Sequence, residues 1–201
     1  MILIDLNQVC IANILQEIKQ IKKIEPLLVK HMILSTLLFY RRKFAVRYGE
    51  LVICCDSKRS WRKDVFAFYK ANRKTNRQKD DIDWNGIFEV INSITEDLKT
   101  QFPYAVISVD QAEADDIIGT LSKNHYRNEK IMIVSSDKDF LQLQKYYNVE
   151  QYSPTQKKNL TCDDPSHYLK EHIMKGDRGD GIPNFLSDDD TFVTDKRSKK
   201  I

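Results

Sequence analysis

The amino-acid sequence predicts an α/β fold with a mostly parallel central sheet flanked by helices. Two observations carry this prediction: short aliphatic runs alternate with longer amphipathic segments, and acidic residues follow the aliphatic runs where strands would end. Alternation of this kind is typical of parallel strands joined by right-handed helical crossovers. The length of 201 residues fits one domain of ordinary size, or one domain with an appendage.

Four runs have the length and composition of buried parallel strands, because each is short, rich in aliphatic side chains and flanked by polar residues. The neighbouring Cys54 and Cys55 should point to opposite faces of their strand. In chain order, the four runs are Ile2–Ile4, Leu51–Cys55, Ala105–Val109 and Ile131–Val134.

Amphipathic segments with apolar residues near i, i+3 and i+4 separate these strands and predict helices. They cover residues 26–48, 84–101 and 114–124, and a further helical stretch covers residues 165–175. The alternation weakens after residue 153. We therefore expect one α/β domain over residues 1–153 and the start of a C-terminal helical region over residues 154–201.

The composition excludes several classes of protein. With 41% hydrophobic and 30% charged residues, the chain is too apolar for a disordered protein. No stretch reaches the roughly 18–20 uncharged apolar residues that a membrane span needs, and we find no secretory signal. The four cysteines have no zinc-site spacing and are expected as reduced thiols. We expect a cytoplasmic protein, in the host cytoplasm if a phage encodes it.

The charge is concentrated in one segment. Residues 58–79 hold nine basic residues and one acid, a net charge of +8, so that the rest of the chain sums to −5 within a total of +3. Clustered lysines and arginines release condensed counterions from nucleic acid, which favours a polyanionic partner. A solvated helix face would explain the charge alone equally well.

Acidic residues gather where the predicted strands end, and a further pair follows the last predicted helix. Because parallel strands present their carboxyl ends at one edge of the sheet, these carboxylates should converge. At about 4 Å, each like-charged pair costs on the order of 1–4 kcal/mol, so the cluster requires cations. The candidate metal ligands are Asp5, Asp56, Glu113, Asp115, Asp116, Asp137, Asp139, Asp177 and Asp180.

Oxygen ligands with no histidine or cysteine nearby in sequence select Mg²⁺, or Mn²⁺ as a substitute, over zinc. Two such ions about 3.5–4 Å apart activate a water and stabilise the departing oxygen of a phosphodiester. Other roles remain open for single residues. Asp5 and Asp56 could be helix N-caps, and Asp116 could be a first-turn charge facing the helix dipole. The four histidines show no paired spacing and are interpreted as structural or exposed.

Taken in order, the motifs of this chain resemble the 5′-nuclease family, which includes flap endonucleases and the 5′-nuclease domain of bacterial DNA polymerase I. The resemblance spans roughly residues 1–185. It implies a PIN-like, resolvase-like core, a basic helical arch at about 58–79 and a C-terminal helix-three-turn-helix segment. The motifs are Ile2–Asp5, Cys55-Asp56, Arg62 with Tyr69–Arg73, Glu113–Asp116, Ser136–Asp139 and Gly176–Asp180.

The resemblance also implies an activity: a metal-dependent 5′ to 3′ exonuclease and structure-specific flap endonuclease of ribonuclease H type. Such an enzyme removes RNA primers and adjoining DNA in lagging-strand replication. The implied cofactor is two Mg²⁺ ions, and the implied substrates are DNA and RNA/DNA duplexes with 5′ ends or flaps. We expect a monomer that does not bind membranes, with a single-strand-binding protein or a sliding clamp as a partner.

The family's functional residues carry over by position. Two acid clusters would each hold a metal ion, with Asp116 beside them and Asn7 supporting them. The first cluster is Asp5, Asp56, Glu113, Asp115 and Asp137, and the second is Asp139, Asp177 and Asp180. Lys70 and Arg73 would be catalytic, in contact with the phosphate near the cut. The expected nucleic-acid contacts are Arg62, Lys63, Lys70, Arg73, Lys74 and Arg77.

The sequence departs from the family pattern near its end. Ser187–Asp190 stands where a glycine-rich turn is expected, and the chain stops at Ile201, so we expect an incomplete C-terminal segment with weaker, more salt-sensitive binding. Two alternatives remain: a PIN-like endoribonuclease, which needs fewer acids and no basic arch, and a non-catalytic nucleic-acid-binding module. A haloacid-dehalogenase-like phosphatase is disfavoured, because Asp5-Leu6-Asn7 lacks its second acid.

Overall fold

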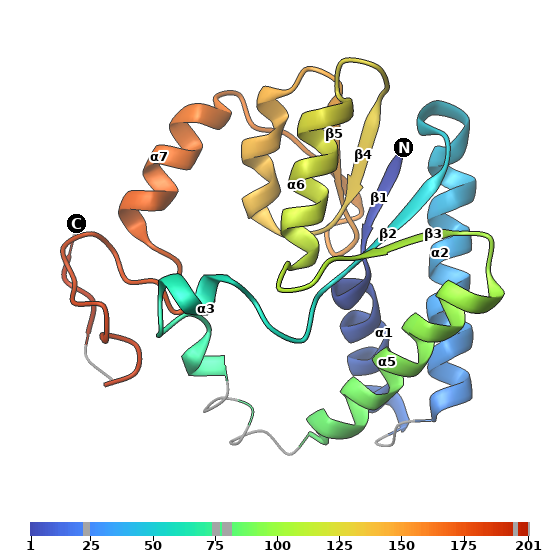
Figure 1. Cartoon of the computed structure of the whole chain (residues 1–201), viewed down its shortest axis with the longest axis horizontal. Helices are drawn as coiled ribbons and strands as arrows, with labels where there is room; N and C mark the ends of the chain where they lie inside the picture. Colours follow the sequence, from blue (N-terminus) through green and yellow to red (C-terminus); the bar gives the residue numbers. More distant parts are fainter. Residues whose placement is uncertain (22–24, 74–76, 78–81, 195–196, 201) are drawn as a thin grey trace.

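The computed structural model describes residues 1–21, 25–73, 77, 82–194 and 197–200 (Figure 1). It confirms the predicted α/β fold with a mostly parallel sheet. The strands are β1 (Ile2–Asp5), β2 (Leu51–Cys55), β3 (Ala105–Ser108), β4 (Ile131–Val134), β5 (Val149–Ser153) and β6 (Lys158–Leu160). The helices are α1 (Leu6–Ile21), α2 (Pro26–Tyr48), α3 (Arg62–Val65), α5 (Trp84–Gln101), α6 (Ala114–His125), the 3₁₀ helix η1 (Lys138–Lys145) and α7 (Pro165–Lys175).

The order of strands across the sheet is β3-β2-β1-β4-β5-β6, and each neighbouring pair is parallel except β5 with β6. The chain builds outward from β1 to β2 and β3, then returns to the other side of β1 to form β4 and β5. The order of strands therefore reverses between β1 and β4. In open α/β sheets, ligands bind outside the carboxyl ends of the strands at such a reversal.

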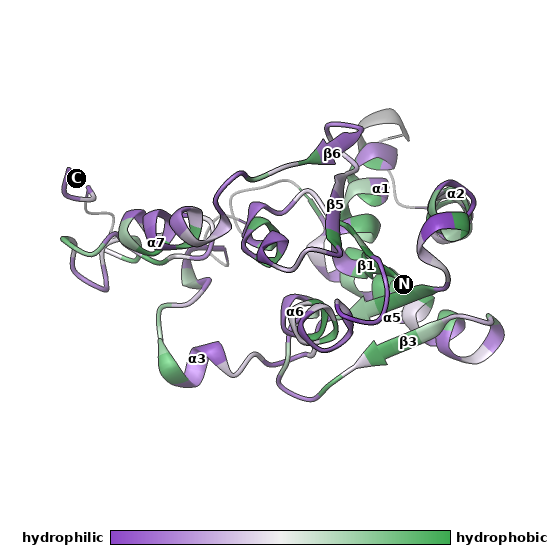
Figure 2. Cartoon of the chain, turned by 90° about the horizontal axis from the view of Figure 1, so that it is seen from above, coloured by the Kyte–Doolittle hydropathy of each residue, from purple (hydrophilic) through white to green (hydrophobic). Residues whose placement is uncertain are grey.

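Helices cover both faces of the sheet. Ile2 and Ile4 of β1 pack on one side with buried residues of α1, α2 and α5. Leu3, between them, packs on the other side with α6 and η1. As predicted, Cys55 and Cys54 divide between the same two cores, and all four cysteines are free. Figure 2 shows green, hydrophobic residues along β1 at the centre of the molecule.

The long helix α2 shows why an amphipathic pattern predicted it correctly. Pro26 stands at its first turn, where a missing N–H costs no hydrogen bond. Its buried residues recur every three or four positions and face the sheet. They are Val29, Ile33, Leu37, Tyr40, Phe44 and Tyr48. The helix ends at Gly49, whose positive φ of 83° suits glycine and whose N–H bonds to the Ala45 carbonyl.

Several elements were not predicted. α1 starts directly after β1 with no intervening loop, so its pattern merges with that of the strand. β5 mixes polar and apolar residues, yet it is buried because β6 covers its edge and η1 lies beside it. The predicted strand at Ala105–Val109 ends one residue earlier, at Ser108. Within the described residues, no helix is long and apolar enough to cross a bilayer.

The predicted boundary after residue 153 stays a prediction. α7 packs against η1 of the preceding region. Figure 1 shows α7 and the C-terminal segment at one side of the sheet, next to α3. The basic segment, expected as a helical arch, is helical in its described part at α3 and at residues 71–73 and 77.

Ile53 tests the core. It is fully buried in the centre of β2. We expect Ile53→Ala to lower the free energy of unfolding by about 2–5 kcal/mol, because it leaves a cavity between sheet and helices. Urea denaturation measures this change. Val46→Ala, at a fully exposed α2 position, is the control and should stay within about 0.5 kcal/mol of the parent. Equal effects of the two variants would contradict the assigned core.

Candidate functional site

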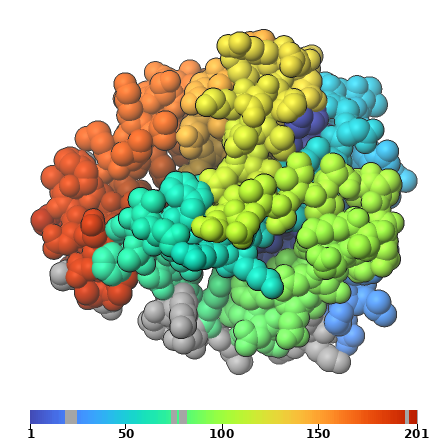
Figure 3. Space-filling view, in the orientation of Figure 1, coloured from blue at the N-terminus to red at the C-terminus, as the bar shows by residue number. Residues whose placement is uncertain are grey.

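A cleft of about 1640 Å³ opens at the carboxyl ends of the parallel strands. In the space-filling view, dark-blue N-terminal residues are visible in the hollow between the teal segment after β2 and the green residues of α5 (Figure 3). Acids from five separate stretches of chain and bases from the segment after β2 line this cleft together. The candidate ligands among them are Asp5, Asp56, Glu113, Asp115, Asp137 and Asp180.

Asp5 and Asp115 have strongly raised pKa values. Burial, together with repulsion from Asp56 and Asp137, raises the pKa of Asp5 to about 7. Burial and repulsion from Asp5 and Asp137 raise the pKa of Asp115 to about 8. Asp5 ends β1 and Asp115 lies in the first turn of α6, so the fold brings residues 110 positions apart in the sequence into one electrostatic cluster.

Asp56 and Asp137 are held in place by hydrogen bonds. Asp56 follows β2, accepts a 2.7 Å hydrogen bond from the Ala114 N–H, and also accepts one from the Asn7 side chain. Asp137 follows β4 and caps η1 by accepting from the Asp139 N–H at 2.9 Å. Asn7 therefore supports a candidate ligand, as the sequence analysis suggested.

Glu113 differs from these acids because the basic segment neutralises it. The Tyr69 hydroxyl donates to its carboxylate at 2.7 Å, and the Lys70 ammonium lies 3.0 and 3.1 Å from its two oxygens. Burial alone would raise the pKa of Glu113, but these hydrogen bonds lower it below its ordinary value. The same hydrogen bond fixes the Tyr69 side chain beside Glu113.

Asp116 is engaged by protein groups. Its two oxygens accept hydrogen bonds of 2.7 and 2.9 Å from the Arg62 guanidinium, and it caps its own helix by accepting from the Glu113 N–H. Although burial opposes it, the Arg62 contacts lower the pKa of Asp116. The geometry thus favours the helix-start role that the sequence analysis left open. Asp116 lines a smaller neighbouring cleft with Arg62.

The second predicted cluster divides in two. Asp139 and Asp177 lie together, with His172 of α7 between them: its Nε2 is 3.1 Å from Asp139 Oδ1 and 3.7 Å from Asp177 Oδ2. Burial and repulsion from Asp137 raise the pKa of Asp139 to about 6. Asp180 instead forms a 2.6 Å ion pair with Arg73 and lies 3.9 Å from the Lys70 ammonium.

Basic residues form one wall of the cleft. Lys63, Lys70, Arg73 and Arg77 line it, and the Arg77 guanidinium lies 5.0 Å from the rings of Trp84 and Phe88. The predicted contact Lys74 lies outside the described residues.

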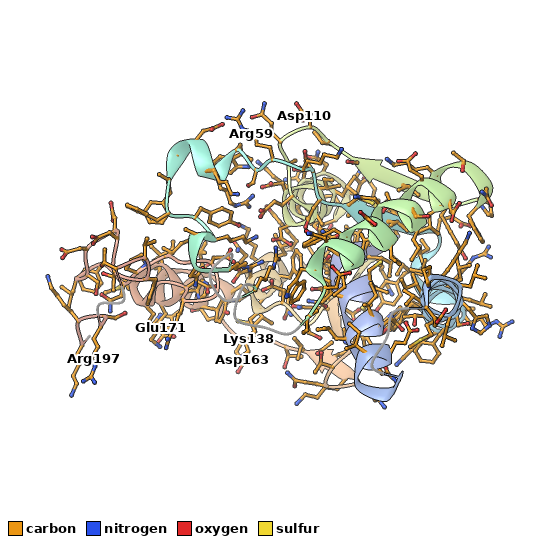
Figure 4. The ribbon with its side chains drawn as sticks, turned by 90° about the horizontal axis from the view of Figure 1, so that it is seen from below. Arg59, Asp110, Lys138, Asp163, Glu171 and Arg197 are labelled. Carbon is orange, nitrogen blue, oxygen red and sulfur yellow. The ribbon has the colours of Figure 1, made fainter. Side chains whose placement is uncertain are left out.

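Arg62 points instead to Asp116 and lines the neighbouring cleft. Figure 4 shows Arg59 and Asp110 next to each other at the outer edge of the molecule, where their charges interact. Among the described bases of this segment, Arg59 and Arg62 therefore do not line the main cleft.

The base of the basic segment is docked onto the loop after α7. The Lys70 N–H donates to the Asp180 carbonyl at 2.7 Å, and the Asn72 side chain donates to the Arg178 carbonyl at 2.8 Å. Gly181, with φ of 74°, permits this approach, because a Cβ there would lie 3.0 Å from the Phe68 carbonyl oxygen. The loop that carries Asp177 and Asp180 thus also positions Lys70.

Two residues of the site were missed by sequence reasoning. The Gln8 side-chain carbonyl accepts from the Ser136 N–H at 2.6 Å and ties the start of α1 to the end of β4. His172 was interpreted as structural or exposed. Its place on the predicted helix, five residues before Asp177, was the available signal.

The first acid group fits divalent cations. Asp5 and Asp115 retain raised pKa values because no described protein cation neutralises them as fully as Lys70 and Tyr69 neutralise Glu113. No histidine lines this cleft in the described part of the chain. Carboxylate oxygens without nitrogen ligands suit Mg²⁺ or Mn²⁺.

Comparisons with known proteins agree with this arrangement. A family model described as the 5′-3′ exonuclease, N-terminal resolvase-like domain, matches residues 7–173. The chain is 36% identical over 198 residues to a ribonuclease H of Enterobacteria phage T4. It is 30% identical over 142 residues to a 5′-3′ exonuclease of Buchnera aphidicola subsp. Schizaphis graminum.

These alignments cover 96% of this chain with 65% of the phage T4 protein, and 66% of this chain with 46% of the Buchnera protein. The chain thus spans about half to two thirds of the length of these relatives. The fold also matches a structure of the bacteriophage T5 flap endonuclease with DNA and metal ions, with a TM-score of 0.76 and 18% identity. That match covers 96% of this chain and 72% of the T5 chain.

The raised pKa values predict how stability depends on pH. Asp5 and Asp115 shift from 3.8 to about 7 and about 8, so their protonated forms favour the folded state. This contribution is complete below pH 3.8 and is lost as the pH rises through the folded pKa values. In the absence of divalent metal, we therefore expect the melting temperature of the protein to decrease as the pH rises from about 4 to about 8. Thermal denaturation monitored by circular dichroism measures it.

Asp115→Asn should flatten this dependence and raise the metal-free melting temperature at pH 8 by about 2–4 °C per kcal/mol of repulsion removed. Mg²⁺ should stabilise the parent more than the variant. Asp189→Asn, at an exposed acid outside the cleft, is the control and should keep the parent profile. If the metal-free parent and Asp115→Asn show the same pH dependence of the melting temperature, the predicted repulsion is contradicted.

Proposed function

The chain belongs to the 5′-3′ exonuclease family, which confirms the resemblance inferred from its motifs, and from this premise we propose that it is a metal-dependent 5′ to 3′ exonuclease and flap endonuclease. Its proposed substrates are DNA and RNA/DNA duplexes with 5′ ends or flaps, including the RNA primers of lagging-strand replication. Its proposed cofactor is Mg²⁺, with Mn²⁺ as a substitute, and its proposed place of action is the cytoplasm.

One observation carries this proposal: a single cleft has repelling carboxylates on its floor and cationic side chains on its wall. Carboxylates alone would repel a nucleic acid, and cations alone would bind it without cutting it. Both are needed where bound metal ions act on a phosphodiester whose neighbouring phosphates are held by lysine and arginine.

Asp5, Asp56, Asp115 and Asp137 would hold the metal ions in the first group. A divalent ion held by these carboxylates would supply an activated water and stabilisation of the departing oxygen. Asp56 is kept in position by Asn7 and the Ala114 N–H. Asp116 we assign to holding Arg62 at the base of the basic segment, because Arg62 engages both its oxygens.

Lys70 and Arg73 would contact the phosphate beside the cut. Both line the cleft, and both are now paired with acids, Lys70 with Glu113 and Arg73 with Asp180. These ion pairs hold the flexible side chains of Lys70 and Arg73 next to the acidic residues of the cleft. A positive charge fixed there stabilises the charge that develops on a phosphate in the transition state. Lys63 and Arg77, farther along the wall, would bind neighbouring phosphates.

A PIN-like endoribonuclease is the second candidate. It shares the acids at the strand ends. The basic residues that line the cleft, and the contact of their segment with the loop after α7, favour the exonuclease and flap endonuclease instead. A single-strand-binding protein or sliding clamp as partner, and a monomeric state, stay predictions of the sequence. A labelled 5′-flap duplex and a single-stranded RNA without a junction, each with and without Mg²⁺, separate the two activities. Cutting of the RNA alone would favour the second candidate.

Asp115→Asn tests the acidic floor. We expect it to lower the cleavage rate of a 5′-flap duplex by about 10²–10³-fold or more, because it removes a metal-binding charge from the reacting centre. DNA binding should be retained or improved, since one phosphate-repelling charge is gone. Chelation should stop the parent enzyme. Asp189→Asn serves as the control. Normal cleavage by Asp115→Asn would remove Asp115 from the ligand set.

Lys70→Ala tests the wall. We expect kcat to fall by about 10²-fold while the dissociation constant for the flap duplex rises much less, because the charge acts mainly in the transition state. Arg127→Ala, at an exposed base on the α6 side that lines neither cleft, should match the parent in both. Single-turnover kinetics and fluorescence anisotropy measure the two constants. Loss of binding with unchanged kcat would assign Lys70 to binding alone.

A further inference from the structure

A smaller cleft of about 370 Å³ lies between α6 and η1, which pack side by side (Figure 1). It shares Asp115 and Asp180 with the main cleft, so the two spaces meet at the acidic residues. Its volume is near the lower end of the range of about 300–1,000 Å³ that is typical of small-ligand sites. The α6–η1 cleft therefore suits one or two units of a single strand and is too small for a duplex.

A lysine lies at the end of the α6–η1 cleft that is farther from the acids. Both helices begin at the carboxyl edge of the sheet, so their later residues line that end. Lys123 is one of them, and no acid of the described chain forms an ion pair with it. Arg62 and Arg73, by contrast, are each paired with an acid. The other side chains at this end offer hydroxyl, amide and aromatic groups: Thr120, Gln142 and Tyr146.

The aromatic ring of Tyr146 is held in a fixed orientation. It stacks on the ring of Tyr126, which follows α6, with centroids 4.6 Å apart. The Lys145 ammonium lies 5.2 Å from the Tyr146 ring centroid. Stacking on an aromatic side chain accepts any nucleic-acid base, because every base has a π face, and nearby cations bind the phosphates. A tyrosine between two lysines at the end of a cleft is therefore suited to a single strand.

Gly119 leaves the side of the cleft open in the middle of α6. A glycine inside a helix is less favourable than alanine, because it loses more backbone freedom on folding. Packing does not require it here: outside its own helix, no heavy atom of the described residues lies within 4 Å of where a Cβ would be. Gly119 lines the cleft instead. A glycine at such a position lets a ligand approach the helix closely.

We propose that the α6–η1 cleft binds a single-stranded segment of nucleic acid that continues from the acidic residues of the main cleft. Lys123 and the Thr120 hydroxyl contact a phosphate, a base stacks against Tyr146, and the strand passes over Gly119. This assignment deepens the proposed nuclease and rests on it for the identity of the strand, which is the unpaired 5′ flap. The competing explanation is that the duplex part of the substrate lies over α6 and η1.

Lys123→Ala distinguishes the two explanations. Fluorescence anisotropy compares a labelled 5′-flap duplex with the same duplex lacking the flap, in the presence of a chelator so that nothing is cut. We expect binding of the flap duplex to weaken by about fivefold or more, and its logarithmic salt dependence to decrease by about 0.7, the value for one single-strand phosphate contact. Binding of the flapless duplex should not change. Lys130→Ala, at an exposed position outside both clefts, is the control and should alter neither.

Gly119→Ala and Gly119→Leu fill the cleft in two steps. Alanine should raise the melting temperature by about 1–4 °C, because it favours the helix more than glycine does. Leucine should keep the melting temperature at or above that of the parent. Affinity for the flap duplex should nevertheless fall by about tenfold or more in Gly119→Leu, because the side chain occupies the place of the strand. A misfolded variant cannot combine higher stability with weaker binding of the flap alone.

The aromatic contact has its own pair of variants. Tyr146→Ala should weaken binding of the flap duplex by about fivefold or more, whereas Tyr146→Phe should retain it, because the ring remains. Tyr147→Ala is the matched control, since Tyr147 is exposed and lines neither cleft.

Three results would overturn the assignment: equal weakening of both duplexes by Lys123→Ala, parent-like flap binding by Gly119→Leu, or equal effects of Tyr146→Ala and Tyr147→Ala. A different result would reject the proposed function and uphold the cleft. In that case the variants reduce flap binding as expected, but the parent cuts no flap duplex when Mg²⁺ is supplied.

Discussion

The repulsion among carboxylates collected at the carboxyl edge of the parallel sheet is the interaction on which the rest of the site depends. β1, β2 and β4 end at that edge, so Asp5, Asp56 and Asp137 meet there although they are far apart in the sequence. Burial is the larger cause, and together with this repulsion it raises the pKa of Asp5 to about 7 and that of Asp115 to about 8. Some of these acids are neutralised by lysine or arginine side chains, and the others are not.

Lysine and arginine side chains neutralise part of this negative charge. Glu113, Asp116 and Asp180 each face a lysine or arginine of the basic segment, and the pKa values of Glu113 and Asp116 are lowered as a result. Among the described residues, no lysine or arginine pairs with Asp5 or Asp115 at close range. This division separates acids that pair with the basic segment from acids whose charge no described protein cation balances at close range. Residue type does not make that distinction, because all of them are aspartate or glutamate.

The sequence could predict the fold and the region of the site because both depend on local signals. Aliphatic runs set the strands, and topology then brings their terminal acids together. It could not separate Asp115 from Asp116, because adjacent residues in a helix point about 100° apart and their surroundings decide their roles. It could not place His172 either. That histidine has no ligand spacing within its own helix and meets Asp139 only through the packing of α7 on η1.

The loop from Gly176 to Gly181 contacts both the acidic residues and the basic segment. It places the Asp177 carboxylate 3.7 Å from His172 Nε2, and its Asp180 carbonyl accepts a hydrogen bond from the Lys70 N–H. Lys70 adopts a positive φ of 55°, a conformation that costs a non-glycine residue about 1–3 kcal/mol and persists where surrounding contacts hold it. Those contacts are the ones to this loop and to Glu113. The ammonium group is therefore positioned by the same few residues that fix one of the acids, so a shift of the loop would move the cationic wall and the acidic floor together.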